Sequence, residues 1–400
     1  MLRTYAETHL LSAASARPAA SDKEGGDSGD EEGSDSEAAP DDVVAWEAGL
    51  RATLGGARQT LKAAVPYGAV AEKLHRPPAT SALFDPSVPS YDVDTFLFPD
   101  DEDVDALCDS GLVSRTFCAK CGSTETKPTQ LISHSFSEEQ LCFLASALLY
   151  PCAVAAAKAP VADGRPFRVV DVGSRLGVVL LAAHETALLA RDVLGEEGAR
   201  RTVTVTGVEL NGPFCDVARK MLQRSVAAAD RRHGNVPLVV TADILGDVGR
   251  QWLRDADFVV MNNVFEWFLP PAEQADAWAV VKKETLLSSG RSTTKDPKFL
   301  MAYPSLEETL GGVFAATDGK GTATDAAVAK FLSGWVERVP VDVDRWLAAR
   351  RPPGGHSHDD GHSCSSSCGG GDSADSERAH TTELLQSMCL YRVVGHVPKV

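Results

Sequence analysis

Between residues 167 and 303 the sequence alternates short apolar runs, rich in β-branched residues, with longer segments of helical periodicity. The short runs are apolar at almost every position, which is typical of parallel strands that helices cover on both faces. This alternation predicts a doubly wound α/β sheet in which helices connect successive strands. The expected strands are residues 168–171, 202–209, 236–241, 257–261 and 298–303, and the expected helices are 176–194, 213–228 and 272–287.

Two more strands are expected near the C-terminal end, at residues 335–339 and 388–394, after a short helix at 324–331. They bring the predicted sheet to seven strands. The tract between them, residues 352–376, is rich in His, Ser, Gly, Cys and Asp. This composition predicts a long disordered insert in the closing hairpin of the sheet.

The chain before this pattern is of a different kind. Residues 1–41 are polar and acidic and are expected to form a disordered tail. Residues 42–130 are expected to form an extension that is helical over 42–74 and mostly irregular after it. The main domain is expected to cover residues 131–400. It should begin with a helix at 137–157, capped by Ser135 or Ser137.

The overall composition limits the partners. The formal net charge of -17 argues against a generally basic surface for nucleic acid, although ten of the acids lie between Ser21 and Asp42. Nine scattered cysteines without a signal peptide indicate reduced thiols inside a cell. No apolar run approaches the roughly 20 residues that span a bilayer. We expect a soluble protein of the cytoplasm or nucleus, with an organellar transit peptide containing Arg3 and Arg17 as the alternative.

A glycine-containing turn joins the first expected strand to the first expected helix. Asp171 ends the strand, and Gly173, Ser174 and Gly177 lie in the turn. Glycine allows a positive φ and a close approach of a ligand to the backbone, and a helix start offers free N–H groups. The turn is therefore a candidate binding loop, and an ordinary strand-to-helix turn is the alternative.

Acids follow the next two strands. Glu209 ends the second strand, where a carboxylate can accept hydrogen bonds from both hydroxyls of a ribose. Asp243 follows the third strand and is a second candidate ligand contact; the alternative is that its side chain caps the next helix. A nicotinamide-dependent dehydrogenase would require Gly-x-Gly-x-x-Gly after the first strand, and this turn has only Gly173 and Gly177. The sequence therefore disfavours that class of enzyme.

The fourth strand leads into a loop that is rich in amides and aromatic residues. Asn262, Asn263 and Glu266 lie at the strand edge where doubly wound sheets bind their ligands, so they are candidates for orienting a substrate. Phe265 and Trp267 are candidates for the walls of that site. The alternative is that these two rings pack against the next helix.

In this order, the segments resemble the class I S-adenosylmethionine-dependent methyltransferases. Asp171, Gly173 and Gly177 are in register with the family motif Asp/Glu-x-Gly-x-Gly-x-Gly, and Arg175 replaces the middle glycine. The resemblance implies a seven-stranded Rossmann-like sheet closed by an antiparallel hairpin, with S-adenosylmethionine as the cofactor. It also implies that the loop holds the methionine portion, and that Asp243 and Ile244 contact the adenine.

The stretch from residue 117 to residue 394 also resembles a eukaryotic family of methyltransferase-like proteins. The motifs concerned are Phe117-Cys-x-x-Cys-Gly-Ser123, Ile132-Ser-His-Ser-Phe136, Asp171-Val-Gly-Ser-Arg-Leu-Gly177 and Met261-Asn-Asn-Val-Phe-Glu-Trp-Phe268. A more distant similarity to the non-SET histone-lysine methyltransferases implies a protein acceptor, with a lysine-type amine oriented by Glu266 or Asn262. A small-molecule or RNA acceptor is one alternative. A non-catalytic scaffold, whose Arg175 loop no longer binds the cofactor, is the other.

Cys118 and Cys121 have half the ligand spacing of a zinc knuckle. Two further ligands would have to come from elsewhere, such as Cys108 or His134, so zinc is a candidate second cofactor. A second candidate metal tract lies in the predicted insert and consists of His356, His358, His362, Cys364 and Cys368.

Overall fold

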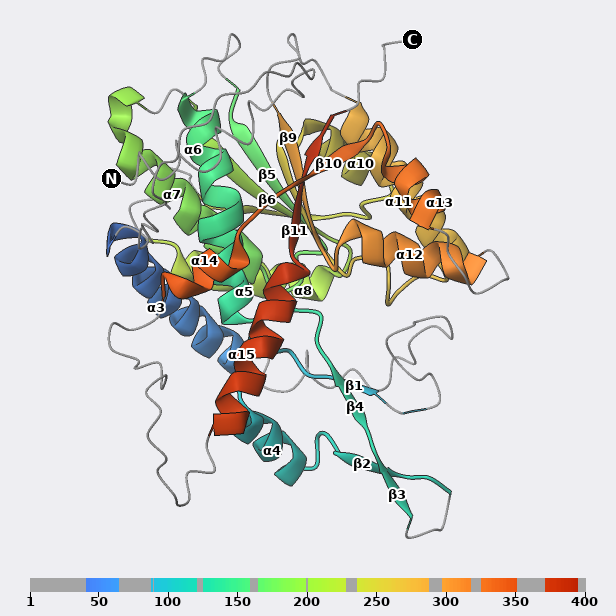
Figure 1. Cartoon of the computed structure of the whole chain (residues 1–400). Helices are drawn as coiled ribbons and strands as arrows, with labels where there is room; N and C mark the ends of the chain where they lie inside the picture. Colours follow the sequence, from blue (N-terminus) through green and yellow to red (C-terminus); the bar gives the residue numbers. More distant parts are fainter. Residues whose placement is uncertain are drawn as a thin grey trace, which may run out of the picture.

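The structure is a computed structural model that describes residues 41–64, 88, 90–120, 125–158, 165–198, 201–227, 236–287, 297–317, 325–350 and 371–394. A seven-stranded sheet lies at the centre with helices on both faces (Figure 1). The predicted fold class, a doubly wound α/β sheet of seven strands, is confirmed.

The strands lie in the order β10-β11-β9-β8-β5-β6-β7 across the sheet. The five strands from β5 to β9 are parallel, whereas β11 is antiparallel to both β9 and β10. The direction of sheet growth reverses between β5 and β8, which is the place where open α/β sheets bind ligands. The strands are β5 (Phe167–Val172), β6 (Val203–Glu209), β7 (Leu238–Thr241), β8 (Phe258–Asn262), β9 (Lys298–Tyr303), β10 (Val336–Val339) and β11 (Cys389–Val393).

Successive residues of the central strands point into two different cores. Val169 of β5 and Val260 of β8 pack with the helices of one face, and their neighbours Val170 and Val259 pack with those of the other. All four are at most 1% exposed, which explains why these strands are apolar at every position. On the first face lie α3 (Asp41–Ala64), α7 (Val178–Gly198) and α8 (Gly212–Ser225); on the second lie α10 (Asp247–Asp255), α11 (Pro271–Leu286), α12 (Leu306–Thr317) and α13 (Asp325–Leu332).

The helix expected at 137–157 consists of three consecutive segments, α5 (Glu138–Phe143), the π-helical η1 (Leu144–Leu149) and α6 (Tyr150–Lys158). Ser137 is its cap: the hydroxyl accepts from the Gln140 N–H, and the Gln140 side chain accepts from the Ser137 N–H. Among the described residues, only this stretch is long and apolar enough to cross a membrane, but 94% of its apolar window is buried inside the structure. It therefore serves here as a core helix.

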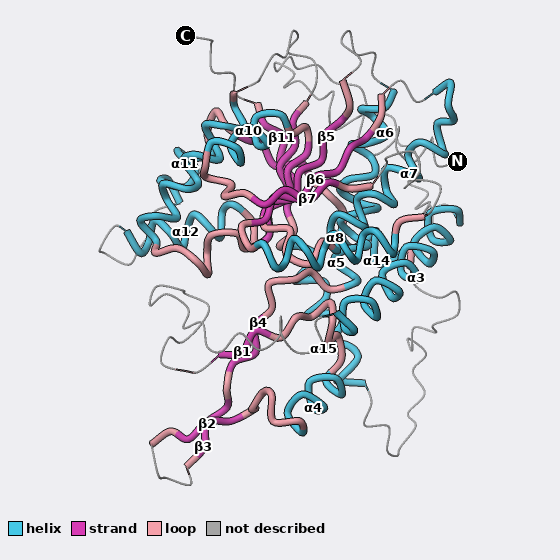
Figure 2. Tube along the Cα trace, turned by 180° about the vertical axis from the view of Figure 1, so that it is seen from behind, coloured by secondary structure: helices cyan, strands magenta, loops and turns pink. Residues whose placement is uncertain are grey.

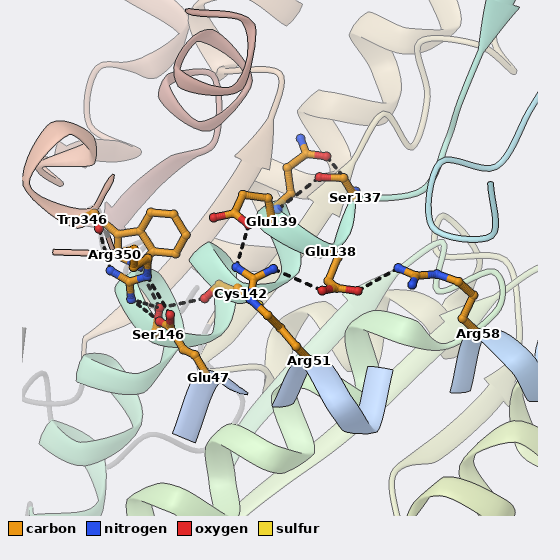
Figure 3. Close-up of polar contacts among 11 residues, drawn as sticks. Glu47, Arg51, Arg58, Ser137, Glu138, Glu139, Cys142, Ser146, Trp346 and Arg350 are labelled. Atoms are coloured by element: carbon orange, nitrogen blue, oxygen red, sulfur yellow. Dashed lines mark hydrogen bonds and ion pairs between the residues drawn. The ribbon is translucent and has the colours of Figure 1, made fainter. Parts of the chain in front are cut away.

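Helix α3 is fastened to the start of α5 by ion pairs (Figure 3). Arg51 pairs with Glu138 at 3.2 Å and with Glu139 at 2.6 Å, and Arg58 pairs with Glu138 at 2.8 Å. Arg58 also donates to the carbonyl oxygen of Phe96 at 2.6 Å. The same helix therefore holds both α5 and the segment around Phe96.

Two short strand pairs lie beyond the carboxyl ends of the parallel strands (Figures 1 and 2). β1 (Ser90–Asp92) pairs in parallel with β4 (Gln130–Ile132), and β2 (Thr116–Cys118) pairs with β3 (Thr126–Pro128). The connection between β1 and β2 includes α4 (Asp101–Asp109). Regular elements thus occur where the sequence predicted mainly irregular chain.

Several boundaries differ from expectation. The first helix is described only as far as Ala64, so the expected residues 65–74 lie outside the described part. The expected insert at 352–376 overlaps α15 (Gly371–Gln386), so its last residues are helical rather than irregular. The helices α10, α12 and α14 (Val343–Ala348) were not predicted from the sequence. They have 9, 12 and 6 residues, so few turns carry their apolar period.

Candidate functional site

The loops after β5 and β8 meet at the point where the sheet reverses its direction of growth. A methyl group on Gly173, in the first loop, would lie 3.9 Å from both γ-carbons of Val264 in the second. Residues from two distant parts of the sequence therefore form the two sides of one site, as expected at a topological switch point.

The loop after β5 has three residues with positive φ: Gly173 at 71°, Arg175 at 45° and Gly177 at 80°. Gly177 is needed for a second reason, because a β-carbon there would lie 3.0 Å from the β-carbon of Ala218 on α8. The loop is thus built for a tight backbone path against α8.

Arg175 adopts the conformation that a glycine would take, so its side chain does not change the path of the loop. Its guanidinium group points to the segment after β1 and pairs with Asp92 at 2.6 Å and Asp94 at 3.2 Å. It also lies over the Phe214 ring, with 5.7 Å between Cζ and the ring centroid. The replacement of the middle glycine is therefore accommodated by contacts outside the loop.

Glu209 closes β6 beside this loop and is 9% exposed. One carboxylate oxygen accepts from the Arg175 N–H at 2.9 Å, and the other accepts from the Asn211 N–H at 2.7 Å. Each oxygen keeps a further lone pair for a ligand hydroxyl. The next residue, Leu210, is 71% exposed, an apolar side chain at the rim that sequence reasoning missed.

Asp171 lies one residue before the end of β5 and is only 3% exposed. Its Oδ2 atom has no hydrogen-bond partner among the described residues, and neither has the buried hydroxyl of Ser174. Burial, and secondarily the negative charge of Glu209, raises the pKa of Asp171 well above its ordinary value of 3.8. A buried carboxyl group that lacks a donor for one oxygen among the described residues thus lies within the electrostatic influence of a second carboxylate, an arrangement that is common at functional sites.

The loop after β7 contributes Asp243 and Ile244. Asp243 is exposed, and its Oδ1 accepts from the Leu245 N–H at 2.8 Å in the turn before α10. The N-cap of α10 is Gly246, so Asp243 is not the helix cap of the alternative interpretation. Ile244 is 8% exposed and packs in the second core, so little of its surface is open to a ligand ring. Val248, in the first turn of α10, is 61% exposed. The adenine contact predicted for Asp243 and Ile244 stays a prediction.

Asn262 and Asn263 lie at the end of β8. Asn263 has a φ of 47°, and its N–H donates to the Tyr303 carbonyl at the end of β9. Its side chain donates to the Oδ1 atom of Asn262 at 3.3 Å, and Asn262 in turn donates to the carbonyl oxygen of His134 at 3.3 Å. The two amides therefore form a connected pair that joins β8 to the segment before α5.

The aromatic residues of this loop divide between the core and the site. Phe265 is 3% exposed and packs edge-to-face on Trp278 of α11, with 5.5 Å between the ring centroids, so it takes the core role rather than lining the site. Trp267 and Phe268 lie against the His134 ring at 5.2 and 5.5 Å between centroids. Glu266 accepts from the Phe265 N–H at 3.0 Å, and burial raises the pKa of its carboxyl.

The segment 133–136, which precedes α5, contacts both the loop after β5 and the loop after β8. The Ser135 hydroxyl donates to Asp94 at 2.6 Å, and the carbonyl oxygen of His134 accepts from Asn262. Sequence reasoning singled out this segment as a motif but assigned it no place in the site. The segment belongs to the candidate site only because the folded chain brings it next to two loops that come much later in the sequence.

The predicted zinc site is not supported by the described residues. Cys118 is exposed at the end of β2, whereas Cys121 and the tract 356–368 lie outside the described part. Within that part, no three His, Cys, Asp or Glu side chains are grouped closely enough to hold a metal ion. Zinc remains only a sequence prediction.

No protein-family model matches the sequence, and no curated protein sequence matches it. Among solved structures, the chain is similar to a putative protein-L-isoaspartate O-methyltransferase from Plasmodium falciparum in complex with S-adenosyl-L-homocysteine, at 13% identity and a TM-score of 0.25. That overlap covers 48% of this chain and 66% of the other. An O-methyltransferase from Bacillus cereus, also bound to S-adenosylhomocysteine, overlaps 51% of this chain and 74% of its own, at 13% identity and a TM-score of 0.30.

A methyltransferase from Podospora anserina bound to S-adenosylhomocysteine gives similar values: 13% identity, a TM-score of 0.29, and 48% of this chain against 74% of the other. These overlaps leave about half of this chain unmatched. The strand order and the antiparallel closing hairpin, described above, carry the assignment. The chain has the doubly wound, seven-stranded α/β fold of the class I methyltransferase type.

Proposed function

We propose that the chain is an S-adenosylmethionine-dependent methyltransferase. The observation that carries the proposal is the buried Oδ2 atom of Asp171, which has no hydrogen-bond partner within the described part of the chain. Asp171 lies beside the glycine loop, close enough to Glu209 for the two charges to interact. A buried polar atom without a partner is uncommon and calls for a ligand. S-adenosylmethionine offers an ammonium group, which suits the Asp171 oxygen without a donor among the described residues, and two ribose hydroxyls, which suit the remaining lone pairs of Glu209.

The residues around the two loops fit the parts of this cofactor. The Gly173–Gly177 loop and Asp171 would hold the methionine portion, and Glu209 would accept from the ribose hydroxyls. The exposed side chains of Leu210 and Val248 offer apolar surface for the adenine.

The cofactor supplies an activated methyl group, so the protein mainly aligns the acceptor and excludes water. Asn262, Asn263 and Glu266 are the groups that would orient the acceptor at the end of β8. Burial raises the pKa of Glu266, so its ionised carboxylate would accept a proton from the acceptor amine more readily than an ordinary glutamate.

A protein side-chain amine is the acceptor class that we favour. Its support is the group of Trp267, Phe268 and His134 rings next to Asn262, because aromatic faces attract ammonium groups. Phe268 is 58% exposed, so this side of the site is open to a large substrate. A small-molecule or RNA acceptor is the alternative outcome of the test.

The first test is calorimetric titration of the full chain with S-adenosylmethionine and S-adenosylhomocysteine. We expect micromolar binding by the wild type, and about 100-fold weaker binding by Glu209→Ala, which corresponds to about 2.7 kcal/mol. Glu209→Gln keeps the shape of the side chain and should weaken binding less. The control is Glu337→Ala, on an exposed ion pair of β10. Folded wild-type protein that binds neither ligand would favour the scaffold alternative.

The second test concerns the acceptor. The enzyme is incubated with methyl-labelled cofactor and separate protein, RNA and small-molecule fractions of a cell extract. We expect label in the protein fraction, reduced at least 10-fold by the double variant Asn262→Ala/Asn263→Ala. Label that appears only in another fraction would contradict the protein assignment without touching the cofactor assignment.

A further inference from the structure

We propose that Arg175 is a positioning residue that ties a two-part cover to the cofactor loop. The cover consists of residues 92–97, which are the last residue of β1 and the chain after it, and residues 133–136, which precede α5. This inference rests on the proposed function, because the cover would close over the cofactor. It gives a role to the residue that departs from the methyltransferase loop motif.

The first part of the cover is held by charge. The Arg175 side chain is 13% exposed and lies between the carboxylates of Asp92 and Asp94, which are 11% and 0% exposed. Removal of the guanidinium group would leave two carboxylates buried without their cation, which is far less favourable than the loss of an exposed ion pair. Asp94 also accepts from the N–H groups of Phe96 and Leu97, both at 3.1 Å, so its position sets the path of this segment.

The second part of the cover is joined to the first by hydrogen bonds of several hydroxyl groups. Ser135 donates to Asp94 at 2.6 Å and accepts from Arg175 at 3.3 Å. Thr95 adds a hydrogen bond from its hydroxyl to the Ser135 carbonyl at 3.0 Å. The adjacent His134 carbonyl then accepts from Asn262, on the acceptor side. The cover thus connects the loop after β5 to the loop after β8.

The backbone of Arg175 supplies the link to the cofactor. Its N–H donates to Glu209, the candidate ribose ligand, while its side chain holds the cover. A φ of 45° is less favourable for arginine than for glycine. The contacts of the Arg175 side chain and N–H therefore have to offset this conformational cost. Because the same residue contacts Glu209 and the cover, ordering of the cover and binding at Glu209 are coupled.

The test is hydrogen exchange followed by mass spectrometry on the full chain, with and without S-adenosylmethionine. The variants are Arg175→Gly, which suits the backbone, Arg175→Lys, which keeps the charge, and Asp92→Asn, which leaves the loop intact. Arg191→Gln, on an exposed pair of α7, is the matched control. Circular dichroism and thermal unfolding establish that each variant is folded, and Asp92→Asn decides the matter should Arg175→Gly not fold.

Without ligand, we expect exchange in residues 92–97 and 133–136 to be at least 10-fold faster in Arg175→Gly and Asp92→Asn than in the wild type. Arg175→Lys should restore part of the protection, and Arg191→Gln should match the wild type. Across these variants, the dissociation constant for S-adenosylmethionine should rise roughly in proportion to the exchange rate of the two segments.

Unchanged exchange in both segments for folded Arg175→Gly and Asp92→Asn would overturn the proposal. So would faster exchange with an unchanged dissociation constant, since the coupling would then be absent. A wild-type protein that binds no S-adenosylmethionine would contradict the proposed function. The exchange rates of the variants without ligand would still show whether Arg175 holds residues 92–97 and 133–136 in place.

Discussion

At the scale of single residues, Asp171 is the position where stability and binding oppose each other. Its carboxyl is buried and close enough to Glu209 for the two charges to interact, and one of its oxygens has no hydrogen-bond partner among the residues that the structure describes. Its raised pKa means that the folded state binds the proton more tightly than the unfolded state. The free energy of unfolding therefore falls as the pH rises from about 3.8 to the higher folded-state pKa.

Asp171→Asn should stabilise the ligand-free protein at neutral pH, because it removes this unfavourable charge. We expect a melting temperature higher by roughly 2 °C or more, the shift that about 1 kcal/mol produces in a large domain. The difference should vanish below the ordinary pKa of 3.8, where both side chains are neutral. Thermal unfolding across pH checks this, and a variant less stable than the wild type at neutral pH would contradict it.

The same substitution should weaken binding of S-adenosylmethionine about 10-fold or more, since the carboxylate that would face the ammonium group is lost. Titration of the variant beside the wild type measures this. An unchanged affinity would remove Asp171 from the proposed cofactor site.

At the scale of elements, α3 holds both parts of the cover through one arginine. Arg58 lies between α5, through Glu138, and the cover, through the carbonyl oxygen of Phe96. Its guanidinium group also lies over the Phe96 ring at 5.0 Å from the centroid. Because α5 begins directly after residues 133–136, a shift of α3 would move both parts of the cover.

Arg58→Ala should destabilise the protein by about 1–3 kcal/mol, since a carboxylate and a carbonyl each lose a charged donor. The side chains of Arg58 and Glu138 are 20% and 25% exposed, so solvent screens the pair only in part. Urea unfolding measures the change. Arg191→Ala, whose ion pair is exposed, should stay within about 0.5 kcal/mol, and an equally small effect of Arg58→Ala would contradict the prediction.

At the scale of the whole molecule, the helix at residues 41–64 shares a core with the sheet. Leu50, Leu54, Ala57 and Leu61 are at most 2% exposed and belong to the same apolar cluster as Val169 of β5. From the sequence, this helix was predicted to belong to a separate extension. The spacing of its apolar residues shows that one face is buried but does not show which surface that face covers.

Leu54→Ala should therefore cost about 2–5 kcal/mol, the range for large-to-small changes in a packed core. Val44→Ala, at a position that is 38% exposed on the same helix, should cost less than about 0.5 kcal/mol. Chemical denaturation with a single transition would show that helix and sheet unfold together. A separate transition for the helix, or a negligible cost at Leu54, would support an independent extension.

The sequence by itself determined the class of fold and the order of the polar residues at the strand ends. Parallel strands covered on both faces must be apolar throughout, and glycines must stand where φ is positive, so Val169, Val170, Gly173 and Gly177 could be interpreted locally. Only the tertiary structure decided the partners of Arg175, because Asp92 lies 83 positions away in the chain. It also placed residues 133–136 in contact with the loops after β5 and β8, and Phe265 in the core, since spatial contacts between distant loops leave no periodic trace in a sequence.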